Sequence, residues 1–332
     1  MSFRIGMAGL GRMGRQHLEC YMKMNGVRVS VADPFAEERE ALAMGASSFY
    51  RDMDDMLENE ALDGMDICLP SFLHRAYTVK ALEAGLDVLV EKPLALDASD
   101  MELMLEAEAK SKRRIMAGHV CRFMGQYLKA KALIEGEVLG KPLFFTAWRL
   151  SPTPSGKRHD WMNDKNLTGG TVMDLQVHDI DIANWFFGEP ADFCMVEQEN
   201  PKQKGMDFCH VVSRISYTNG VVAVLEAGHL MPGSYAFTSG YRLIFEDGAL
   251  EFYKTEGGGY RMNLYEKSGS RDMEDWYRRE CSMADPYFEE LEHFINCVRT
   301  GLPFRINARE AKKAVETALK LKGASRFPHR IF

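Results

Sequence analysis

The 332-residue sequence predicts an α/β fold class, with a parallel sheet in an N-terminal domain and a mostly antiparallel sheet in the domain that follows. Two observations support this prediction. Up to about residue 121, short apolar runs alternate with helical patterns, which is typical of a parallel sheet covered by helices on both faces. Beyond that point, longer β-rich runs flank Asn219-Gly220 and Asp247-Gly248, two hairpin dipeptides. We therefore predict domains over residues 1–121 and 122–332.

The elements of the first domain follow one another in regular order. The predicted strands are residues 4–8, 27–32, 48–50, 65–69, 87–90 and 114–117. The predicted helices lie between them, at residues 13–24, 36–44, 74–84 and 98–111.

The second domain is predicted to be an α+β domain with few helices. Its predicted strands are residues 143–150, 210–217, 221–229, 241–246 and 249–253, and its predicted helices are 122–135, 171–187, 286–300 and 308–323. Both hairpin dipeptides tolerate the positive φ angles of a type I′ turn. One predicted strand contains the apolar run Val221-Val222-Ala223-Val224-Leu225, which we do not expect to alternate cleanly between core and water. An uncovered face of this sheet would then expose an apolar patch on a monomer, so we expect a symmetric homodimer or homotetramer packed through the sheet.

Composition excludes several classes of function. With 46% apolar residues, 27% charged residues and a net charge of −7, the chain is typical of a globular protein rather than a nucleic-acid-binding one. Its 7 cysteines include no CxxC pair, so we expect neither a disulfide framework nor a metal site. The sequence has no signal peptide and no apolar run of membrane-spanning length, which predicts a cytoplasmic protein without a membrane partner.

A glycine-rich motif follows the first predicted strand. Gly9-Leu10-Gly11-Arg12-Met13-Gly14 is a GxGxxG run that opens a predicted helix, which is the context of a dinucleotide-binding Rossmann fold. In this motif, the first glycine permits a tight turn, the second lets the backbone approach a pyrophosphate, and the third lets the helix pack on the strand. The N-terminus of the helix then favours the anion.

Asp33 ends the second predicted strand, 24 residues beyond Gly9, where a ribose-binding acid is expected. Its carboxylate would accept hydrogen bonds from the ribose hydroxyls and would repel a 2′-phosphate, so we expect NAD rather than NADP. The alternative is a turn-forming aspartate before Pro34.

Glu91-Lys92-Pro93 follows the strand at 87–90, at the edge of the sheet where ligands bind. Lys92 is therefore expected to point at cofactor or substrate, although an ordinary surface lysine is an equal alternative. Pro93 admits a cis peptide bond, which the sequence leaves open.

The predicted helix at 171–187 carries a polar stripe. Asp174 and His178 are four residues apart and share one face, and Asp181 lies near it. Polar side chains on a largely apolar helix face a wet cleft or a paired interior site. The alternative is that Asp174 favours the helix N-terminus and that His178 is a satisfied core histidine.

A cationic loop precedes this helix. Arg149, His159 and Trp161 are candidate substrate-binding residues there, because they suit a carboxylate or the face of a sugar ring. Asp160 and Asp164 offset the charge of Lys157 and Arg158, so an ordinary solvated loop is the alternative.

Together these motifs resemble the glucose–fructose oxidoreductase, inositol dehydrogenase and MocA (Gfo/Idh/MocA) family over nearly the whole chain. The likeness also includes Leu69-Pro70-Ser71 followed by His74, Arg122-Phe123, and Gly169-Gly170. It implies a large open sheet in the second domain, an active site between the domains, and the catalytic residues Lys92, Asp174 and His178. The implied cofactor-binding residues are Gly9, Gly11, Arg12, Met13, Gly14, Asp33, Leu69, Pro70, Ser71, His74, Glu91, Lys92 and Arg122.

These residues suit the oxidation of a secondary hydroxyl by NAD. Histidine, with an ordinary pKa of about 6.5, would take the hydroxyl proton, so we assign His178 as the base and Lys92 as the donor to the reacting oxygen. The two residues could exchange part of these roles. Asp174 would bind a neighbouring hydroxyl, so we expect a sugar, an inositol or a sugar acid as substrate. Alternatives are a non-catalytic NAD-sensing regulator, an NAD-assisted glycosidase, and an NADP-dependent reductase.

Overall fold

The computed structural model describes residues 2–153, 160–199, 209–281 and 285–324. By its contacts the chain divides into two compact units, Met1–Phe123 with Ala284–Lys312, and Met124–Met283 with Lys313–Phe332. We had predicted that the segment from residue 284 would belong to the second domain, whereas its contacts up to Lys312 are with the first unit. Every helix in the described ranges is too short or too polar to span a lipid bilayer.

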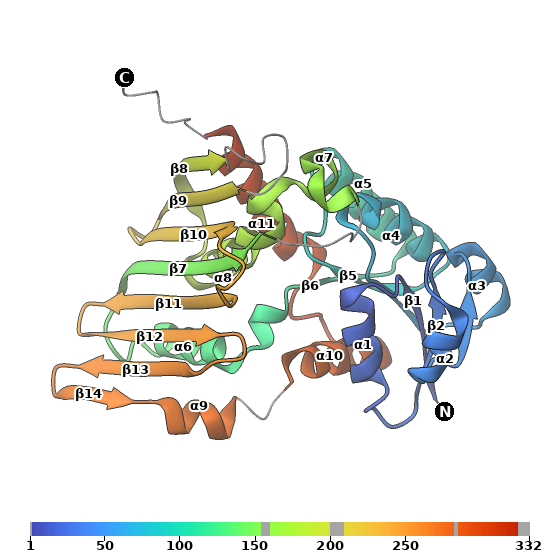
Figure 1. Ribbon diagram of the computed structural model, residues 1–332, viewed down its shortest axis with the longest axis horizontal. Helices are drawn as coiled ribbons and strands as arrows, with labels where there is room; N and C mark the ends of the chain where they lie inside the picture. Colours follow the sequence, from blue (N-terminus) through green and yellow to red (C-terminus); the bar gives the residue numbers. More distant parts are fainter. Residues whose placement is uncertain (1, 154–159, 200–208, 282–284, 325–332) are drawn as a thin grey trace. The chain divides into compact units, whose positions relative to one another are not determined.

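The first unit is built on a six-stranded parallel sheet in the order β3-β2-β1-β4-β5-β6, which confirms the predicted Rossmann sheet (Figure 1). Its strands are β1 (Phe3–Ala8), β2 (Val27–Ala32), β3 (Ser48–Tyr50), β4 (Gly64–Ile67), β5 (Asp87–Glu91) and β6 (Ile115–Gly118). Strands β1, β4 and β5 are almost entirely buried, as expected for a sheet covered on both faces. The order reverses between β1 and β4, and this switch point is where such sheets bind ligands.

Helices cover this sheet and join its strands. They are α1 (Arg12–Tyr21), α2 (Glu38–Ala43), α3 (Met53–Asn59), the short helix η1 (Ser71–Leu73), α4 (His74–Glu83), α5 (Ala98–Ser111) and η2 (Val120–Phe123). The prediction missed α3, whose local pattern is marked by the N-cap Asp52, which accepts a hydrogen bond from the Asp55 backbone N–H. From the end of the chain, α10 (Pro286–Thr300) packs on α1 and supplies Leu291 and Phe294 to the core.

The second unit is built on an eight-stranded sheet in the order β14-β13-β12-β11-β7-β10-β9-β8. All neighbours are antiparallel except β7 and β10, so the predicted mostly antiparallel sheet is confirmed. The strands are β7 (Pro142–Pro152), β8 (Pro190–Glu199), β9 (Cys209–Tyr217), β10 (Val222–Met231), β11 (Thr238–Phe245), β12 (Gly248–Thr255), β13 (Tyr260–Glu266) and β14 (Gly269–Asp272). The prediction missed β8, β13 and β14, which contain few buried residues and so give a weak apolar signal.

The remaining helices are α6 (Gly125–Glu135), η3 (Asp160–Asn163), α7 (Lys165–Thr168), the π-helical turn η4 (Val172–Gln176), α8 (Val177–Phe187) and α9 (Glu274–Glu280), with α11 (Ala308–Gly323) divided between the units. Helix α8 contacts β7 and β10 on one face of the sheet (Figure 1). Side chains of β10 alternate between the two faces, with Ala223 and Leu225 buried and Val222 and Val224 half-buried on the opposite face. Our expectation that this run would not alternate is therefore wrong.

The hairpin turns are placed correctly but are not of the predicted type. Asn219-Gly220 joins the antiparallel pair β9 and β10, and Asp247-Gly248 joins β11 and β12. A type I′ turn needs positive φ at both central residues. Only Gly220 has one, at 89°, whereas Asn219, Asp247 and Gly248 do not. The side chain of Asn219 instead accepts a hydrogen bond from the Val221 N–H and donates one to the Phe187 carbonyl.

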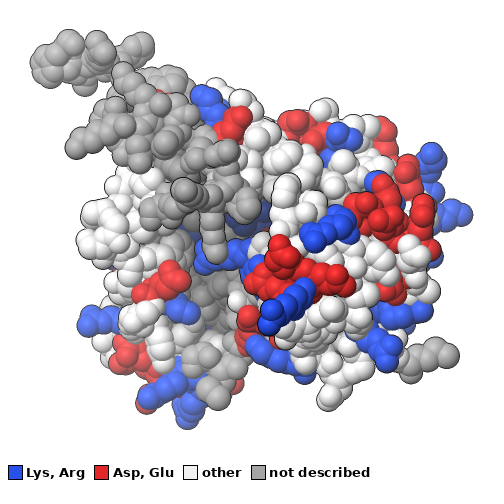
Figure 2. All heavy atoms as spheres, turned by 45° about the vertical axis from the view of Figure 1, so that its right-hand side comes forward, with Lys and Arg blue, Asp and Glu red and all other residues white. Residues whose placement is uncertain are grey.

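Charged side chains are mixed on the surface. On the face drawn in Figure 2, the described lysine and arginine residues are interspersed with aspartate and glutamate. This pattern agrees with the net charge of −7 and gives that face no continuous basic patch of the kind that binds nucleic acid.

Candidate active site

The glycine loop has the geometry that a dinucleotide needs. Gly9 has a φ of 95°, and a Cβ there would lie 2.6 Å from the Cys68 carbonyl oxygen. A Cβ on Gly14 would lie 2.0 Å from the Gly9 carbonyl oxygen, so only glycine allows α1 to pack this closely. A Cβ on Gly11 would meet nothing within 4 Å, and no side chain caps the helix there. The first amides of α1 are therefore suited to a pyrophosphate, flanked by exposed Arg12 and half-buried Met13.

Asp33 follows β2 and is tied to this loop. Its Oδ2 accepts a hydrogen bond of 2.7 Å from the Leu10 N–H, and its Oδ1 accepts from the Phe35 and Ala36 N–H groups. The carboxylate is thus turn-forming, as our alternative reading expected. It retains acceptor capacity, because each carboxylate oxygen has two lone pairs and Oδ2 receives one bond here.

Arg51 is a neighbour of this corner that the sequence analysis missed. It follows β3, and its guanidinium donates a 2.8 Å hydrogen bond to the Ala36 carbonyl oxygen. Its proximity depends on the parallel pairing of β2 with β3, which aligns Ala32 with Tyr50. The positive charge of Arg51 thus lies at the turn that follows Asp33, the predicted ribose-binding residue.

Lys92 is half-buried at the carboxyl end of β5, and its peptide bond to buried Pro93 is cis. The buried Glu91 side chain accepts a 3.0 Å hydrogen bond from the Lys92 backbone N–H through Oε2, and its Oε1 lies 3.3 Å from Nε2 of His17. Burial alone would raise the pKa of Glu91, but the contacts with His17 and Lys92 together outweigh burial, so the pKa is lowered. Glu91 is therefore an ionised support for the Lys92 loop.

His74 is a buried support rather than an exposed ligand. Its Nδ1 lies 2.8 Å from the Pro93 carbonyl oxygen and its Nε2 lies 2.8 Å from the Leu69 carbonyl oxygen. Burial lowers the pKa of His74, while the two carbonyl contacts oppose that shift. With both ring nitrogens engaged by the main chain, we no longer expect His74 to contact a cofactor directly. Leu69, Pro70 and Ser71 are half-buried beside it.

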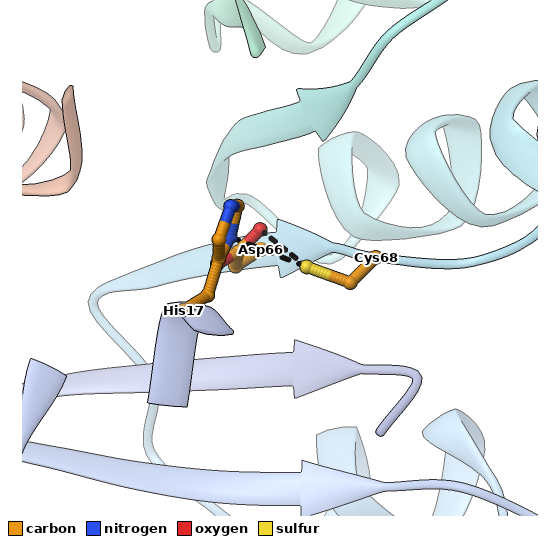
Figure 3. A group of neighbouring side chains, drawn as sticks. All are labelled: His17, Asp66 and Cys68. Atoms are coloured by element: carbon orange, nitrogen blue, oxygen red, sulfur yellow. Dashed lines mark hydrogen bonds and ion pairs between the residues drawn. The ribbon is translucent and has the colours of Figure 1, made fainter. Parts of the chain in front are cut away.

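A polar cluster of three side chains lies between α1 and the end of β4 (Figure 3). His17 of α1 places Nδ1 2.9 Å from Oδ2 of Asp66 on β4 and 3.3 Å from Sγ of Cys68. All three side chains are buried, and the Tyr21 hydroxyl also donates to Asp66. Burial opposes protonation of His17, but the Cys68 and Asp66 contacts outweigh it and raise its pKa well above the ordinary value.

This cluster has ligand types found at metal sites, which the sequence analysis did not expect, because its members are far apart in the chain. The carboxylate of Asp66 nevertheless accepts hydrogen bonds from His17, Tyr21 and Cys68. We interpret the cluster as a hydrogen-bonded hub that joins α1 to the sheet.

In the second unit, Asp174 and His178 stand out from a buried helix. Between residues 171 and 184 they are the two side chains that are not buried. Asp181 is 1% exposed and belongs to the interior instead. The prediction of one regular helix was wrong, because residues 172–176 form a π-helical turn around Asp174. Such turns are frequent at functional sites.

His229 of β10 is a second residue that the sequence analysis missed. Its Nε2 lies 3.6 Å from Oδ2 of Asp174, and its side chain is 8% exposed against 44% for Asp174. No local pattern marks His229, because the contact arises only when β10 packs beneath the π-helical turn.

The candidate residues of the predicted cationic loop lie in different environments. Arg149 is buried on the helix-covered face of β7, where it donates to Asp179 at 3.0 Å and to the Tyr127 hydroxyl at 2.9 Å. We therefore assign Arg149 to the interior of the unit. Trp161 is half-buried in η3, and His159 lies outside the described residues. In the first unit, buried Arg122 lies 3.8 Å from Glu310, so its charge too has a partner within the protein.

Comparison with known proteins agrees with this geometry. Residues 3–119 match the model of an oxidoreductase family with an NAD-binding Rossmann fold, and residues 127–257 match the GFO/IDH/MocA C-terminal domain. The chain is 26% identical to a myo-inositol 2-dehydrogenase of Thermotoga maritima, over 94% of this chain and 93% of that protein. It is 28% identical to a scyllo-inositol 2-dehydrogenase (NAD(+)) of Bacillus subtilis, over 90% of this chain and 86% of that protein.

Solved structures show the same fold. The crystal structure of myo-inositol 2-dehydrogenase from Lactobacillus plantarum superposes with a TM-score of 0.82 and 21% identity, covering 98% of this chain and 97% of that chain. At this identity the likeness concerns the fold alone.

Proposed function

The chain belongs to the Gfo/Idh/MocA oxidoreductase family, and from that premise we propose that it is an NAD-dependent dehydrogenase that oxidises a ring hydroxyl of an inositol, a sugar or a sugar derivative. The observation that supports this most is the pair Asp174 and His178, which alone break the buried surface of residues 171–184. A carboxylate and an imidazole, as the two accessible side chains of an otherwise buried segment, are suited to hydrogen bonds with a substrate rich in hydroxyl groups.

The proposed roles follow from the chemistry of each side chain. His178 takes the proton of the reacting hydroxyl, and the Lys92 ammonium stabilises the charge that develops on its oxygen. Asp174 accepts a hydrogen bond from a neighbouring hydroxyl, and His229 holds the Asp174 carboxylate. NAD, when bound, supplies the hydride acceptor. The uncapped N-terminus of α1 and the open side of Gly11 would hold its pyrophosphate.

The substrate class follows from the same side chains. A hydrophobic alcohol would offer these polar groups no hydrogen bonds, whereas adjacent ring hydroxyls would both donate and accept them. The relatives named as inositol 2-dehydrogenases support a cyclic polyol.

We also propose that the chain forms a symmetric homo-oligomer through the sheet face opposite α8. Val196 and Val212 pair across β8 and β9 on that face and are 46% and 40% exposed. Apolar side chains exposed in adjacent strands are typical of an interface.

The test is a panel of inositols, aldoses, sugar acids and aliphatic alcohols with NAD, read by NADH absorbance. We expect NADH with at least one polyol and none with aliphatic alcohols. NAD binding without turnover on the whole panel would favour a regulator, and release of sugar from a glycoside without net NADH would favour a glycosidase.

A further inference from the structure

One buried histidine joins the two loops to which the proposed function assigns cofactor and substrate. His74 is 1% exposed at the start of α4, and its ring lies between the carbonyl oxygens of Leu69 and Pro93, 2.8 Å from each. Leu69 follows β4 and Pro93 follows β5, which are adjacent parallel strands. The ring therefore bridges two neighbouring loops at the carboxyl edge of the sheet.

The Lys92 backbone is fixed from both sides. On the N-terminal side, its N–H donates to Glu91, whose other carboxylate oxygen faces His17. On the C-terminal side, Pro93 has no N–H, and its carbonyl oxygen faces Nδ1 of His74. A lysine side chain has four rotatable bonds, so the position of its ammonium depends strongly on how firmly its backbone is held.

Each ring nitrogen of His74 faces a different loop. A carbonyl oxygen only accepts hydrogen bonds, so the protonated ring satisfies both contacts and the neutral ring satisfies one. The contact of Nδ1 with the Pro93 carbonyl restrains the residue next to Lys92. The contact of Nε2 with the Leu69 carbonyl restrains the turn at residues 69–71. The two contacts can therefore be separated by substitution.

We propose that His74, when its ring carries both protons, is a positioning residue that sets the Lys92 loop through Nδ1 and the Leu69 turn through Nε2. This inference rests on the proposed function for the role of Lys92 in turnover, and on the sequence prediction that Leu69, Pro70 and Ser71 bind the cofactor. It also predicts that the two roles respond to different atoms of one side chain, which a merely structural histidine would not do.

Three variants separate the atoms. His74→Asn places its amide nitrogen near the position of Nδ1 and keeps a donor for Pro93. His74→Gln reaches the position of Nε2 and keeps a donor for Leu69. His74→Phe keeps a ring and removes both donors. Thr78→Val is the matched control, since Thr78 is fully buried one turn later on α4 and its hydroxyl has no hydrogen-bond partner in the described part of the chain.

At a pH low enough to protonate the His74 ring, we expect the Asn and Gln variants to lose different functions. His74→Gln should lower kcat about 10–100-fold, the loss expected for a misplaced reacting group, with little change in the Kd for NAD. His74→Asn should keep kcat within about 3-fold of the wild type and weaken NAD binding instead. His74→Phe should have both a lower kcat and weaker NAD binding, and Thr78→Val should change neither quantity. Equal kcat in the Asn and Gln variants would overturn the proposal.

Amide hydrogen exchange provides a readout that needs no substrate. Exchange at the Lys92 amide should accelerate in His74→Gln and His74→Phe but not in His74→Asn or Thr78→Val. If exchange at Lys92 is the same in all four variants, the proposed bridge is wrong, whatever the wild type oxidises. If exchange follows the predicted order but the wild type oxidises no polyol, the bridge stands and the proposed function fails.

Discussion

The carboxylate of Asp174 lies 3.6 Å from Nε2 of His229, so a π-helical turn and the strand β10 meet at the residue assigned to bind substrate. Asp174 is 44% exposed while the His229 side chain is 8% exposed. The buried imidazole thus lies against a carboxylate that is partly exposed to solvent. This arrangement suits a hydrogen bond from a substrate hydroxyl.

The first prediction tests this pair. His229→Leu should lower kcat/KM about 10-fold, because Asp174 would lose the polar group that lies 3.6 Å from its carboxylate and would be held less firmly in its substrate-binding position. His229→Gln, which retains a donor near the Nε2 position, should lose less. Steady-state kinetics on the best polyol measures both variants. An unchanged kcat/KM in His229→Leu would remove Asp174 from the substrate site.

The second prediction concerns the cofactor. Asp33 should disfavour the 2′-phosphate of NADP, so the wild type should bind NAD more tightly. In Asp33→Ser, the guanidinium of Arg51 in the adjacent turn would attract that phosphate, and the preference should narrow by about 1–3 kcal/mol. The double variant Asp33→Ser with Arg51→Ala should gain less affinity for NADP than Asp33→Ser alone. Equal affinity of the wild type for both cofactors, measured by calorimetry, would contradict this reading of Asp33.

The sequence predicted the first unit better than the second for a physical reason. Gly9 and Gly14 lie in one short loop, and Asp33 binds the N–H groups of Phe35 and Ala36 just after it, so spacing along the chain reveals all three. His229 and Arg51 become neighbours of the candidate site only through strand pairing and packing, which local patterns do not encode. Asp174 and His178 were found because helical periodicity is local. The π-helical turn was not, because its sequence also suits an ordinary helix.

The third prediction concerns His17, which lies between the carboxylates of Asp66 and Glu91. Because its folded pKa is raised, its contribution to stability is present below about pH 6.5, the unfolded value, and is lost as the pH rises through the folded value. Both ring nitrogens should therefore carry protons at pH 7.5 in a nitrogen-15 NMR spectrum. His17→Leu should cost about 3–5 kcal/mol of unfolding free energy at pH 6, the usual loss for a broken buried ion pair. A neutral His17 ring at pH 7.5 would refute this prediction.

The fourth prediction concerns assembly. Light scattering should give a mass of two or four times the 37.6 kDa chain. The double substitution Val196→Lys with Val212→Lys places two like charges on the sheet face and should shift the mass toward one chain. Leu103→Lys, on the 46% exposed Leu103 of α5, is the control and should leave the mass unchanged. A wild type of 37.6 kDa at micromolar concentration would exclude the proposed interface.

The most direct measurement is the rate of NADH formation from the best polyol by the wild type, Lys92→Ala and His178→Asn, with NAD binding measured in parallel. His178→Asn should lower kcat about 10²–10⁴-fold, the usual contribution of a general base, and Lys92→Ala should lose most turnover. The Kd for NAD should change little in His178→Asn, and Lys92→Ala should still bind NAD. Near-normal kcat in either variant would show that the side chain it lacks does not carry the chemistry.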